Sequence, residues 1–339
     1  MKDRKKYVLG LLLMLMAISF ITSCGNKAEE PEKYQRQPIY AFLPPYTDAG
    51  SSNVDNCNHQ SRNVLIKNTE NGGTESIAAC IKCGYSSSGY RFYYTYTDYH
   101  RDCASGGKYS GESKKIIINL DSNYNDSKFV FQSTVEEVIF VGAEGQTNNN
   151  LQIEVLSRTT PIILGFSNVR ISSDKSVLVS EKCAAKVIVQ SYGTSNSFAT
   201  KKGADGKDGG TGYTYYGQLM AHDGKDGESA ADVFVVKGDV EFIVYSPISI
   251  SGGRGGNGGD GGSLNTNLPT SGGGGAGGAG GSGGDAINTN GIVTISGNKT
   301  MVDFTGGAGG KGGRGGYGRN QSSKAEDGVK GKDGKTGLE

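Results

Sequence analysis

Cysteine and histidine side chains that could bind a metal gather near the start of the chain. Cys57 and His59 form one closely spaced pair, and Cys80 and Cys83 form a second pair in the spacing Cys-x-x-Cys-Gly. Two pairs of sulfur and nitrogen ligands, each on a short turn, suit a tetrahedral zinc ion. Because the protein would fill all four positions, this zinc would be structural, whereas a catalytic zinc keeps one position open for water.

A weaker third pair, His100 and Cys103, follows in the same region. The two closely spaced pairs resemble the knuckles of small bacterial zinc-ribbon-like modules. Disulfides are the alternative, because Cys103 makes the cysteines of this region an even four, and disulfides form outside the reducing cytosol. In either case residues 55–110 are too few to be stable on a hydrophobic core alone, so we expect a small module stapled by a metal or by cross-links.

Residues 1–23 have the pattern of a secretion signal. A basic start precedes an apolar run that is too short for a membrane-spanning helix. The next residues, Ile21-Thr22-Ser23-Cys24, resemble the bacterial lipobox. The resemblance implies that Cys24 carries the lipid and becomes the first residue of the mature protein. Residues 24–54, polar and rich in proline, would then be a tether to the membrane.

Location and charge limit the classes of partner. Gly25 after the lipidated cysteine resembles the signal for release toward the outer membrane, so we expect a lipid-anchored protein of the cell envelope, in the outer membrane and exposed at the cell surface. The leader holds four of the 35 basic residues and one of the 34 acidic residues, so the remainder is close to neutral. This balance gives no electrostatic reason to expect nucleic acid as a partner.

From residue 111 to residue 250 the chain is a succession of short apolar strands joined by Asn, Ser, Gly and Asp turns. Equivalent strands recur about every two dozen residues, as from Val138 to Ile162 to Val187 and from Ile153 to Val177. No segment with a helical pattern connects consecutive strands. We therefore predict an all-β, right-handed parallel β-helix, a solenoid, with a β-sandwich as the alternative.

The stretch around Gly193-Thr194-Ser195-Asn196-Ser197 carries a resemblance to a known family. It is similar to the right-handed β-helix domains of bacterial surface proteins often described as carbohydrate-binding. Enzymes with this fold bring carboxylates and basic residues together one rung apart. The acidic residues of this region are Glu136, Glu137, Glu154, Asp174 and Glu181. They do not recur at that spacing, so we expect no catalytic set.

Residues 251–339 are rich in glycine, with strands expected at 292–304. Three runs repeat Gly-Gly-X four times, which suits a three-fold extended helix of the polyproline II type. With the glycines near 203–212 and 224–227, the runs predict three out-and-back excursions, which place six polyglycine II-like segments side by side. Ala276, Ala279 and Ala308 are expected inside this bundle. Flexible, disordered linker is the alternative interpretation.

The excursions would end in three tips, at residues 213–223, 264–272 and 319–327. The composition and period resemble the polyglycine II bundles of phage tail-fibre adhesins, in which loops at the tips select the receptor. The candidate ligand-binding residues lie in or beside these tips: Tyr213, Tyr215, Tyr216, His222, Asn265, Asn267, Arg319 and Asn320. One nonapeptide, 280–288, matches a calcium-binding repeat, but no tandem copy follows, so calcium is not expected.

The sequence therefore predicts a non-catalytic, surface-facing lipoprotein that binds a glycan or a protein ligand, an adhesin. Two alternatives stay open. One is a polysaccharide-acting β-helix enzyme whose active site lies in loops, and the other is a structural protein of the cell envelope.

Overall fold

The computed structural model describes residues 61–68, 74–80, 90–93, 114–120, 128–131, 133–143, 145–180, 184–215, 218–264, 272–318 and 324–338. All of them belong to the second of two units into which the chain divides, Pro38–Glu339. Strands and extended segments make up nearly all of these residues. The one helix among them is a single 3-10 turn, η3 (Lys299–Met301). The all-β class predicted from the sequence is therefore confirmed.

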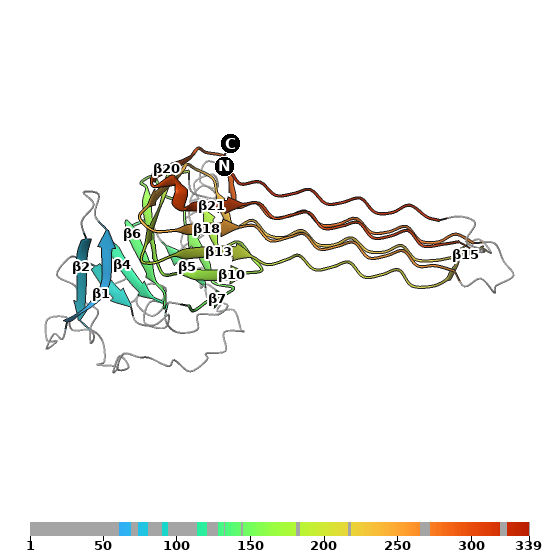
Figure 1. The fold of residues 1–339 in the computed structure, drawn as a ribbon, viewed down its shortest axis with the longest axis horizontal. Coiled ribbons are helices and arrows are strands. Elements are labelled where there is room, and N and C mark those ends of the chain that lie inside the picture. The colour runs from blue at the N-terminus through green and yellow to red at the C-terminus, as the bar shows by residue number, and fades with distance from the viewer. Residues whose placement is uncertain are drawn as a thin grey trace, which may run out of the picture. The chain divides into compact units, whose positions relative to one another are not determined.

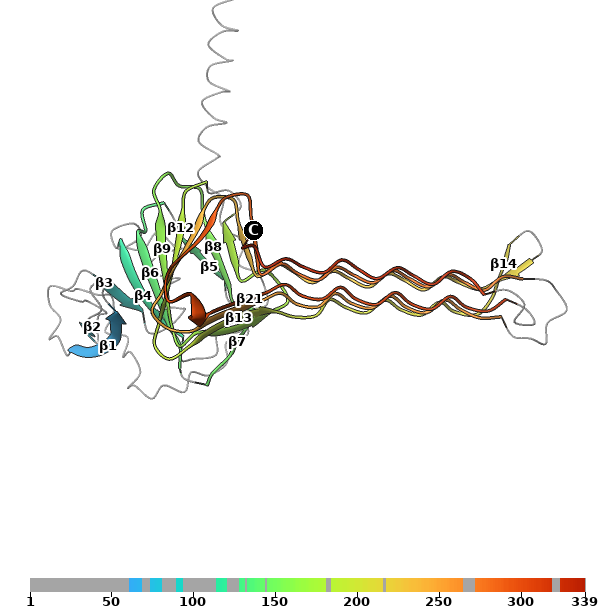
Figure 2. The ribbon, with the colours of Figure 1, turned by 45° about the horizontal axis from the view of Figure 1, so that its top comes forward.

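Three sheets of parallel strands form the strand region (Figures 1 and 2). Sheet A has the order β20-β17-β12-β9-β6-β4-β3. Its strands are β3 (Tyr90–Tyr93), β4 (Lys115–Asn119), β6 (Glu137–Val141), β9 (Ile162–Ser167), β12 (Val187–Tyr192), β17 (Val240–Val244) and β20 (Val293–Gly297). Sheet B has the order β21-β18-β13-β10-β7. Its strands are β7 (Asn148–Asn149), β10 (Arg170–Ser173), β13 (Asn196–Thr200), β18 (Ile248–Ser251) and β21 (Val302–Thr305).

Sheet C has the order β19-β16-β11-β8-β5. Its strands are β5 (Lys128–Phe131), β8 (Gln152–Val155), β11 (Leu178–Ser180), β16 (Phe234–Val236) and β19 (Ile287–Thr289). From β6 onward the chain visits sheets A, B and C in that order again and again, and each strand pairs in parallel with its counterpart one pass earlier. The last pass, β19 to β21, contains the strands expected at 292–304.

The repeat predicted from the strands agrees with the pairing only in part. Ile162 pairs with Val187, as expected. Val138 pairs with Leu164 rather than with Ile162, and Ile153 pairs with Leu178 rather than with Val177. The turns differ in length from pass to pass, so a constant spacing assigns some strands to the wrong register.

Phenylalanine rings fill the space between the sheets. Alternate residues of a strand point inward, as in β17, where Val240, Phe242 and Val244 are buried and the residues between them are half-buried. Eight rings form a continuous series of contacts with centroid distances of 4.8–6.4 Å: Phe129, Phe131, Phe140, Phe166, Phe198, Phe234, Phe242 and Phe304. Burial of one such side chain contributes about 1.5–3 kcal/mol, so this series is a large part of the hydrophobic stabilisation of the strand region, together with the buried aliphatic residues.

Asparagine side chains hold the corners between sheets A and B. Asn168 has a positive φ of 58°, and its Oδ1 accepts hydrogen bonds from the N–H and the hydroxyl of Thr194 at 2.7 and 2.9 Å. Gly193, with φ 73°, lies so close that a methyl group on it would overlap Asn168 Oδ1. The buried Asn196 accepts from Val169 N–H at 2.9 Å and donates to the carbonyl of Tyr192 at 3.0 Å. The glycine and asparagine singled out in the sequence are therefore required by the corner itself.

Six glycine-rich segments, numbered in chain order, extend from the strand region and lie side by side (Figures 1 and 2). They are segments I (201–212), II (221–232), III (252–264), IV (272–286), V (306–318) and VI (324–337). Segments I, III and V follow β13, β18 and β21 and form one row, and the returning segments II, IV and VI form a second row. Between segments I and II the chain turns in an antiparallel hairpin, β14 (Tyr213–Tyr215) and β15 (Gln218–Met220).

Backbone hydrogen bonds join each segment to its neighbours, both within a row and across rows. Gly255 N–H donates to Ala308 O within a row at 2.9 Å, and Gly256 N–H donates across to Glu228 O at 2.8 Å. Gly281 N–H in turn donates to Gly256 O at 2.8 Å. The out-and-back course predicted from the glycine runs is confirmed for these residues, and the alternative of a disordered linker is wrong for them.

Glycine is required where two segments touch. A methyl group on Gly255 would overlap the carbonyl oxygen of Gly281, and one on Gly256 would overlap that of Ala204. Ala308 is exposed and Ala276 and Ala279 are half-buried, so the expectation that these alanines lie inside the bundle is wrong. The interior has no room even for a methyl group, and the third residue of each triplet faces outward.

Near the start of the described chain, β1 (Ser61–Asn68) and β2 (Thr74–Cys80) form an antiparallel pair. Ile77 and Ala79 of β2 are buried. β3, which also lies within the predicted module at 55–110, pairs in parallel with β4 as the outermost strand of sheet A. That part of the module therefore contributes to the same sheet as the strands that follow it.

Candidate binding face

The outward face of sheet B carries a row of polar side chains across four strands. Parallel pairing places Arg170 beside Ser197, Ser197 beside Ser249, and Ser249 beside Asp303. Arg170 and Asp303 are exposed, and the two serines between them are half-buried. The side chains in the middle of this row are short and those at its two ends are longer, so the row forms a trough over β13 and β18.

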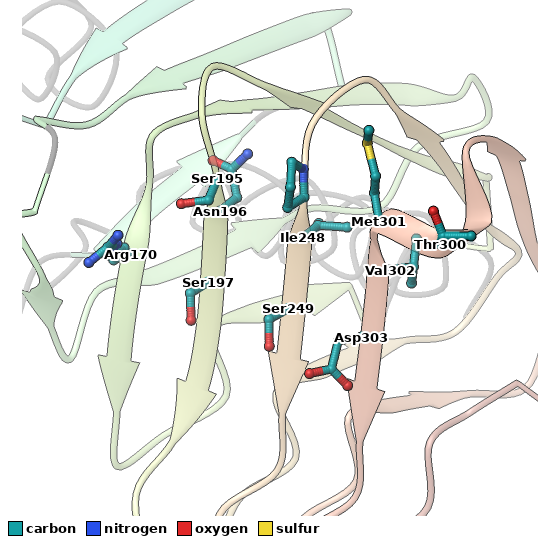
Figure 3. A pocket seen from close by; sticks show the side chains of 11 residues that line it. Arg170, Ser195, Asn196, Ser197, Ile248, Ser249, Thr300, Met301, Val302 and Asp303 are labelled. Atoms are coloured by element: carbon teal, nitrogen blue, oxygen red, sulfur yellow. The ribbon is translucent and has the colours of Figure 1, made fainter.

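A groove of about 470 Å³ follows from this arrangement (Figure 3). Figure 3 shows Arg170 on one side and Thr300, Met301 and Asp303 on the other, with Ser197 and Ser249 between them. The residues that line the groove are Arg170, Ser195, Asn196, Ser197, Pro247, Ile248, Ser249, Thr300, Met301, Val302 and Asp303. The groove thus offers hydroxyl groups, one guanidinium, one carboxylate and an apolar margin.

The groove is built on a rigid base. Asn196 is buried with its side-chain hydrogen bonds made to Val169 and Tyr192, and its amide also donates to Ser246 Oγ at 3.3 Å. Asp303 Oδ1 accepts a hydrogen bond from the hydroxyl of Thr305 at 3.1 Å. Such a surface suits a ligand that is recognised by hydroxyl and charge contacts on a preformed site.

One row of the glycine bundle, segments I, III and V, continues from this sheet and carries a side-chain ladder. Asp205 Oδ1 accepts from Asn257 N–H at 2.6 Å, and Asn257 Oδ1 accepts from Lys311 N–H at 3.1 Å. One triplet further out, Asp208 accepts from Asp260 N–H at 2.8 Å, and Asp260 accepts from Arg314 N–H at 2.7 Å. The outward third residue of one segment therefore satisfies the outward N–H of the next.

The second row repeats the same device. Asp223 and Asp226 accept from the N–H groups of Ala276 and Ala279, each at 2.7 Å. Nearer the strand region, Asp232 accepts from Asp285 N–H and Asp285 accepts from Lys335 N–H, again at 2.7 Å. Short polar side chains thus complete the hydrogen bonding of N–H groups that the neighbouring backbone does not reach.

Three exposed carboxylates of the bundle also bind a lysine on their own segment. Hydrogen bonds from Lys202, Lys324 and Lys330 hold the pKa values of Asp205, Asp327 and Asp333, respectively, below the ordinary value. Backbone N–H donors add to this effect, from Asn257, Gly315 and Gly309 in the same order. These carboxylates therefore stay charged to lower pH in the folded bundle than in the unfolded chain.

The predicted ligand residues are only partly within the described chain. Tyr213 and Tyr215 lie in β14, and His222 is exposed at the outer end of segment II, where its backbone N–H donates to Gly210 O at 3.1 Å. The other five lie outside the described residues: Tyr216, Asn265, Asn267, Arg319 and Asn320. β14, β15 and segment II follow one another in the first excursion, so Tyr213, Tyr215 and His222 all belong to its outer end.

The predicted lipid and metal residues fall mostly outside the described chain as well. Cys80 is the last residue of β2. The others lie outside: Cys24, Cys57, His59, Cys83, His100 and Cys103. Over the ranges that the structure describes, no three His, Cys, Asp or Glu side chains are grouped as metal ligands, and no helix is long and apolar enough to cross a membrane.

Sequence reasoning missed the groove. Its residues recur from one pass to the next, but the interval changes. It is 27 residues from Arg170 to Ser197, before the first excursion, then 52 from Ser197 to Ser249 and 54 from Ser249 to Asp303. Without the excursions at 201–232 and 252–286, the two later intervals shorten to 20 and 19 residues, and this agreement would have aligned Ser197, Ser249 and Asp303. Comparison of this chain with known protein families, curated proteins and solved structures finds no match.

Proposed function

We propose that this protein is a non-catalytic binding protein of the bacterial cell surface, anchored by lipid at Cys24. In this proposal the three parallel sheets form a right-handed β-helix, and the six glycine segments form a polyglycine II bundle that presents loops. The ligand is a glycan or a protein on a neighbouring surface, and the protein acts as an adhesin.

Two features support the architecture. The chain visits sheets A, B and C in a constant order with parallel pairing, which is the course of a β-helix. The glycine segments repeat in triplets and donate hydrogen bonds in several directions, as three-fold extended glycine chains do when packed.

The hydrogen-bonded bundle is the observation that carries the functional proposal. A segment of twelve residues in this conformation spans about 37 Å, so the tips are held well away from the sheets. A flexible glycine linker would sample many positions, and ordering it on binding would reduce affinity. Hydrogen bonds within and between the rows fix the outer ends of the glycine segments in advance, which supports binding by the residues that connect them.

The test compares the full chain with variants of the tip and of the groove. The tip variant combines Tyr213→Ser, Tyr215→Ser and Tyr216→Ser, and the groove variant combines Arg170→Ser and Asp303→Ser. Binding to immobilised bacterial, host-cell and polysaccharide surfaces is measured for each protein. We expect the tip variant to lose binding and the groove variant to keep it.

Other results would redirect the proposal. Loss of binding in the groove variant alone would transfer recognition to sheet B. Cleavage of a polysaccharide by the unmodified chain would favour the enzyme alternative. Absence of binding to every surface, with the tip variant indistinguishable in cells, would favour a structural role in the envelope.

We also propose structural zinc at Cys57, His59, Cys80 and Cys83. Elemental analysis of the purified protein should find one zinc per chain, and these thiols should react only after chelation. No metal and no free thiol among Cys57, Cys80, Cys83 and Cys103 would instead establish disulfides in this module.

A further inference from the structure

The groove on sheet B holds opposite charges apart at its two ends. Arg170 on β10 and Asp303 on β21 are separated by the intervening strands β13 and β18. Neighbouring strands lie about 4.8 Å apart, so the backbones at the two charged residues are about 14 Å apart. Figure 3 shows the two side chains on opposite sides of the groove, with Ser197 and Ser249 between them.

The other two sheets place their opposite charges in contact. Beside β12 of sheet A, Lys186 Nζ donates to Glu241 Oε2 on β17 at 3.0 Å. On sheet C, Lys128 of β5 forms an ion pair with Glu154 of β8 at 2.7 Å. Each of these pairs joins neighbouring strands, so the charges satisfy each other. Arg170 and Asp303 are three strand spacings apart and do not form such a pair.

The floor between the two charges has unused hydrogen-bonding capacity. Ser197 and Ser249 are half-buried there. Within the part of the chain that the structure describes, neither their hydroxyl groups nor the guanidinium of Arg170 hydrogen-bond to another protein group. A hydroxyl both donates and accepts, so the floor can bind a ligand that offers both kinds of group, as peptide amides do.

The separation of the charges selects among ligands. A chain of like charges would be attracted at one end of the groove and repelled at the other. A free amino acid or a zwitterionic lipid headgroup carries its two charges within a few bonds of each other, so it cannot reach both ends. An extended peptide spans about 3.3–3.6 Å per residue, so four residues place their two termini about 14 Å apart.

We propose that the groove binds a short peptide with free termini, about four residues long, which lies across the strands. Its carboxylate binds Arg170, whose guanidinium can donate two parallel hydrogen bonds, and its ammonium donates to Asp303. Pro247 and Met301 line the apolar margin that contacts the peptide side chains. The volume of about 470 Å³ is in the range of sites for small ligands. This site is separate from the tips and does not depend on the function proposed above.

The test titrates the full chain with tetraalanine whose two ends are free or blocked, and measures binding by calorimetry. Amidation of the carboxylate or acetylation of the amine should each weaken binding about fivefold, the effect of losing one exposed ion pair. Arg170→Gln should weaken binding of free tetraalanine by a similar factor but leave the amidated peptide unaffected. Asp303→Asn should do the same for the free and the acetylated peptide.

Two exposed residues outside the groove provide matched controls. Arg254→Gln and Asp174→Asn remove the same charges elsewhere, so both variants should bind all forms of the peptide as the unmodified chain does. Dialanine reaches only one end of the groove, so it should bind no more tightly than tetraalanine with one end blocked.

Several results would overturn the proposal. They are no binding of free tetraalanine, equal binding of its blocked forms, and binding of dialanine as tight as that of tetraalanine. An effect of Arg170→Gln that persists with the amidated peptide would also overturn it, because the guanidinium would then not bind the carboxylate. Binding of cell and polysaccharide surfaces by the tips is measured separately, so the two proposals fail independently.

Discussion

The strand region and the glycine bundle satisfy the same backbone groups with opposite use of side chains. In the strand region, the three sheets enclose a core of phenylalanine and aliphatic residues, and the hydrogen bonds run along the sheets. In the bundle, backbone packs directly on backbone and hydrogen bonds run in several directions. The first region needs large side chains inside, and the second excludes all of them.

This contrast sets what each region tolerates. A hydrophobic core adapts to residues of similar volume, because neighbouring side chains can move. The bundle interior is made of backbone that is already hydrogen-bonded, so a neighbour cannot yield without breaking those bonds. We expect the strand region to be sensitive to lost volume and the bundle to be sensitive to a single added methyl group.

The largest effect is expected from emptying the phenylalanine series. Phe198→Ala removes a ring whose centroid lies 4.8 Å from that of Phe166 and 5.4 Å from that of Phe234. The cavity should reduce the free energy of unfolding by about 3–5 kcal/mol, measured by denaturant titration. Phe198→Leu, which keeps most of the volume, should cost much less. An equal loss for both variants would mean that ring volume does not stabilise this region.

A smaller but more informative effect is expected from adding one methyl group to the bundle. Gly281→Ala would place a methyl group against the carbonyl oxygen of Glu228, between segments II and IV. We expect a cost of about 2 kcal/mol from overpacking and lost hydrogen bonds. This loss of stability should appear in hydrogen exchange as faster exchange of the bundle amides.

Ala279 provides the matched control in the same segment. Ala279→Ser also adds one heavy atom, but the side chain faces outward, so protection of the bundle should not change. If Gly281→Ala were equally silent, direct backbone packing would not hold the segments together.

Loss of one acceptor in the side-chain ladder should have a moderate effect. Asp260→Ala removes the carboxylate that accepts Arg314 N–H at 2.7 Å, an interaction similar to a helix N-cap. A cost of about 1 kcal/mol is expected, detected as faster exchange at Arg314. Asp260→Asn retains an acceptor and should keep most of the protection. Equal exchange in the two variants would assign the effect to charge rather than to the hydrogen bond.

The smallest effect is expected from acid. The pKa values of Asp205, Asp327 and Asp333 are lowered in the folded bundle, so their stabilisation is present above the ordinary value of 3.8 and is lost as pH falls through the lower folded values. Bundle amides should therefore lose protection below about pH 4, before the strand amides do. Asparagine at all three positions should remove this difference. If the bundle amides of this variant still lost protection before the strand amides, other carboxylates would be responsible.

Much of the architecture was predictable, because its signals are local. Runs of β-branched and aromatic residues between polar turns predict strands, and the absence of a helical pattern favours parallel stacking. The Gly-Gly-X period predicts extended segments that lie side by side. Gly193 and Asn196 were singled out as a motif, and both are required at the corner between sheets A and B.

The remainder depends on contacts between residues far apart in the chain. The groove joins Arg170 to Asp303 through two passes that are separated by excursions, so no constant spacing reveals it. The small size of alanine does not place it in the interior of the bundle. A methyl group on the interior residue Gly307 would overlap a backbone carbonyl oxygen, whereas Ala308 beside it is exposed. The side-chain ladder requires knowing which segments are neighbours before the aspartates can be paired with their donors.

The direction of the bundle's hydrogen bonds has a mechanical consequence. The bonds run across the segments, as from Gly310 N–H to Gly281 O, while a pull on a tip acts along them. Such a load shears many bonds at once instead of opening them one after another. Force applied at the tips is therefore shared by the rows and transmitted to the ends of β13, β18 and β21 and to the starts of β16 and β19, where the phenylalanine core resists it.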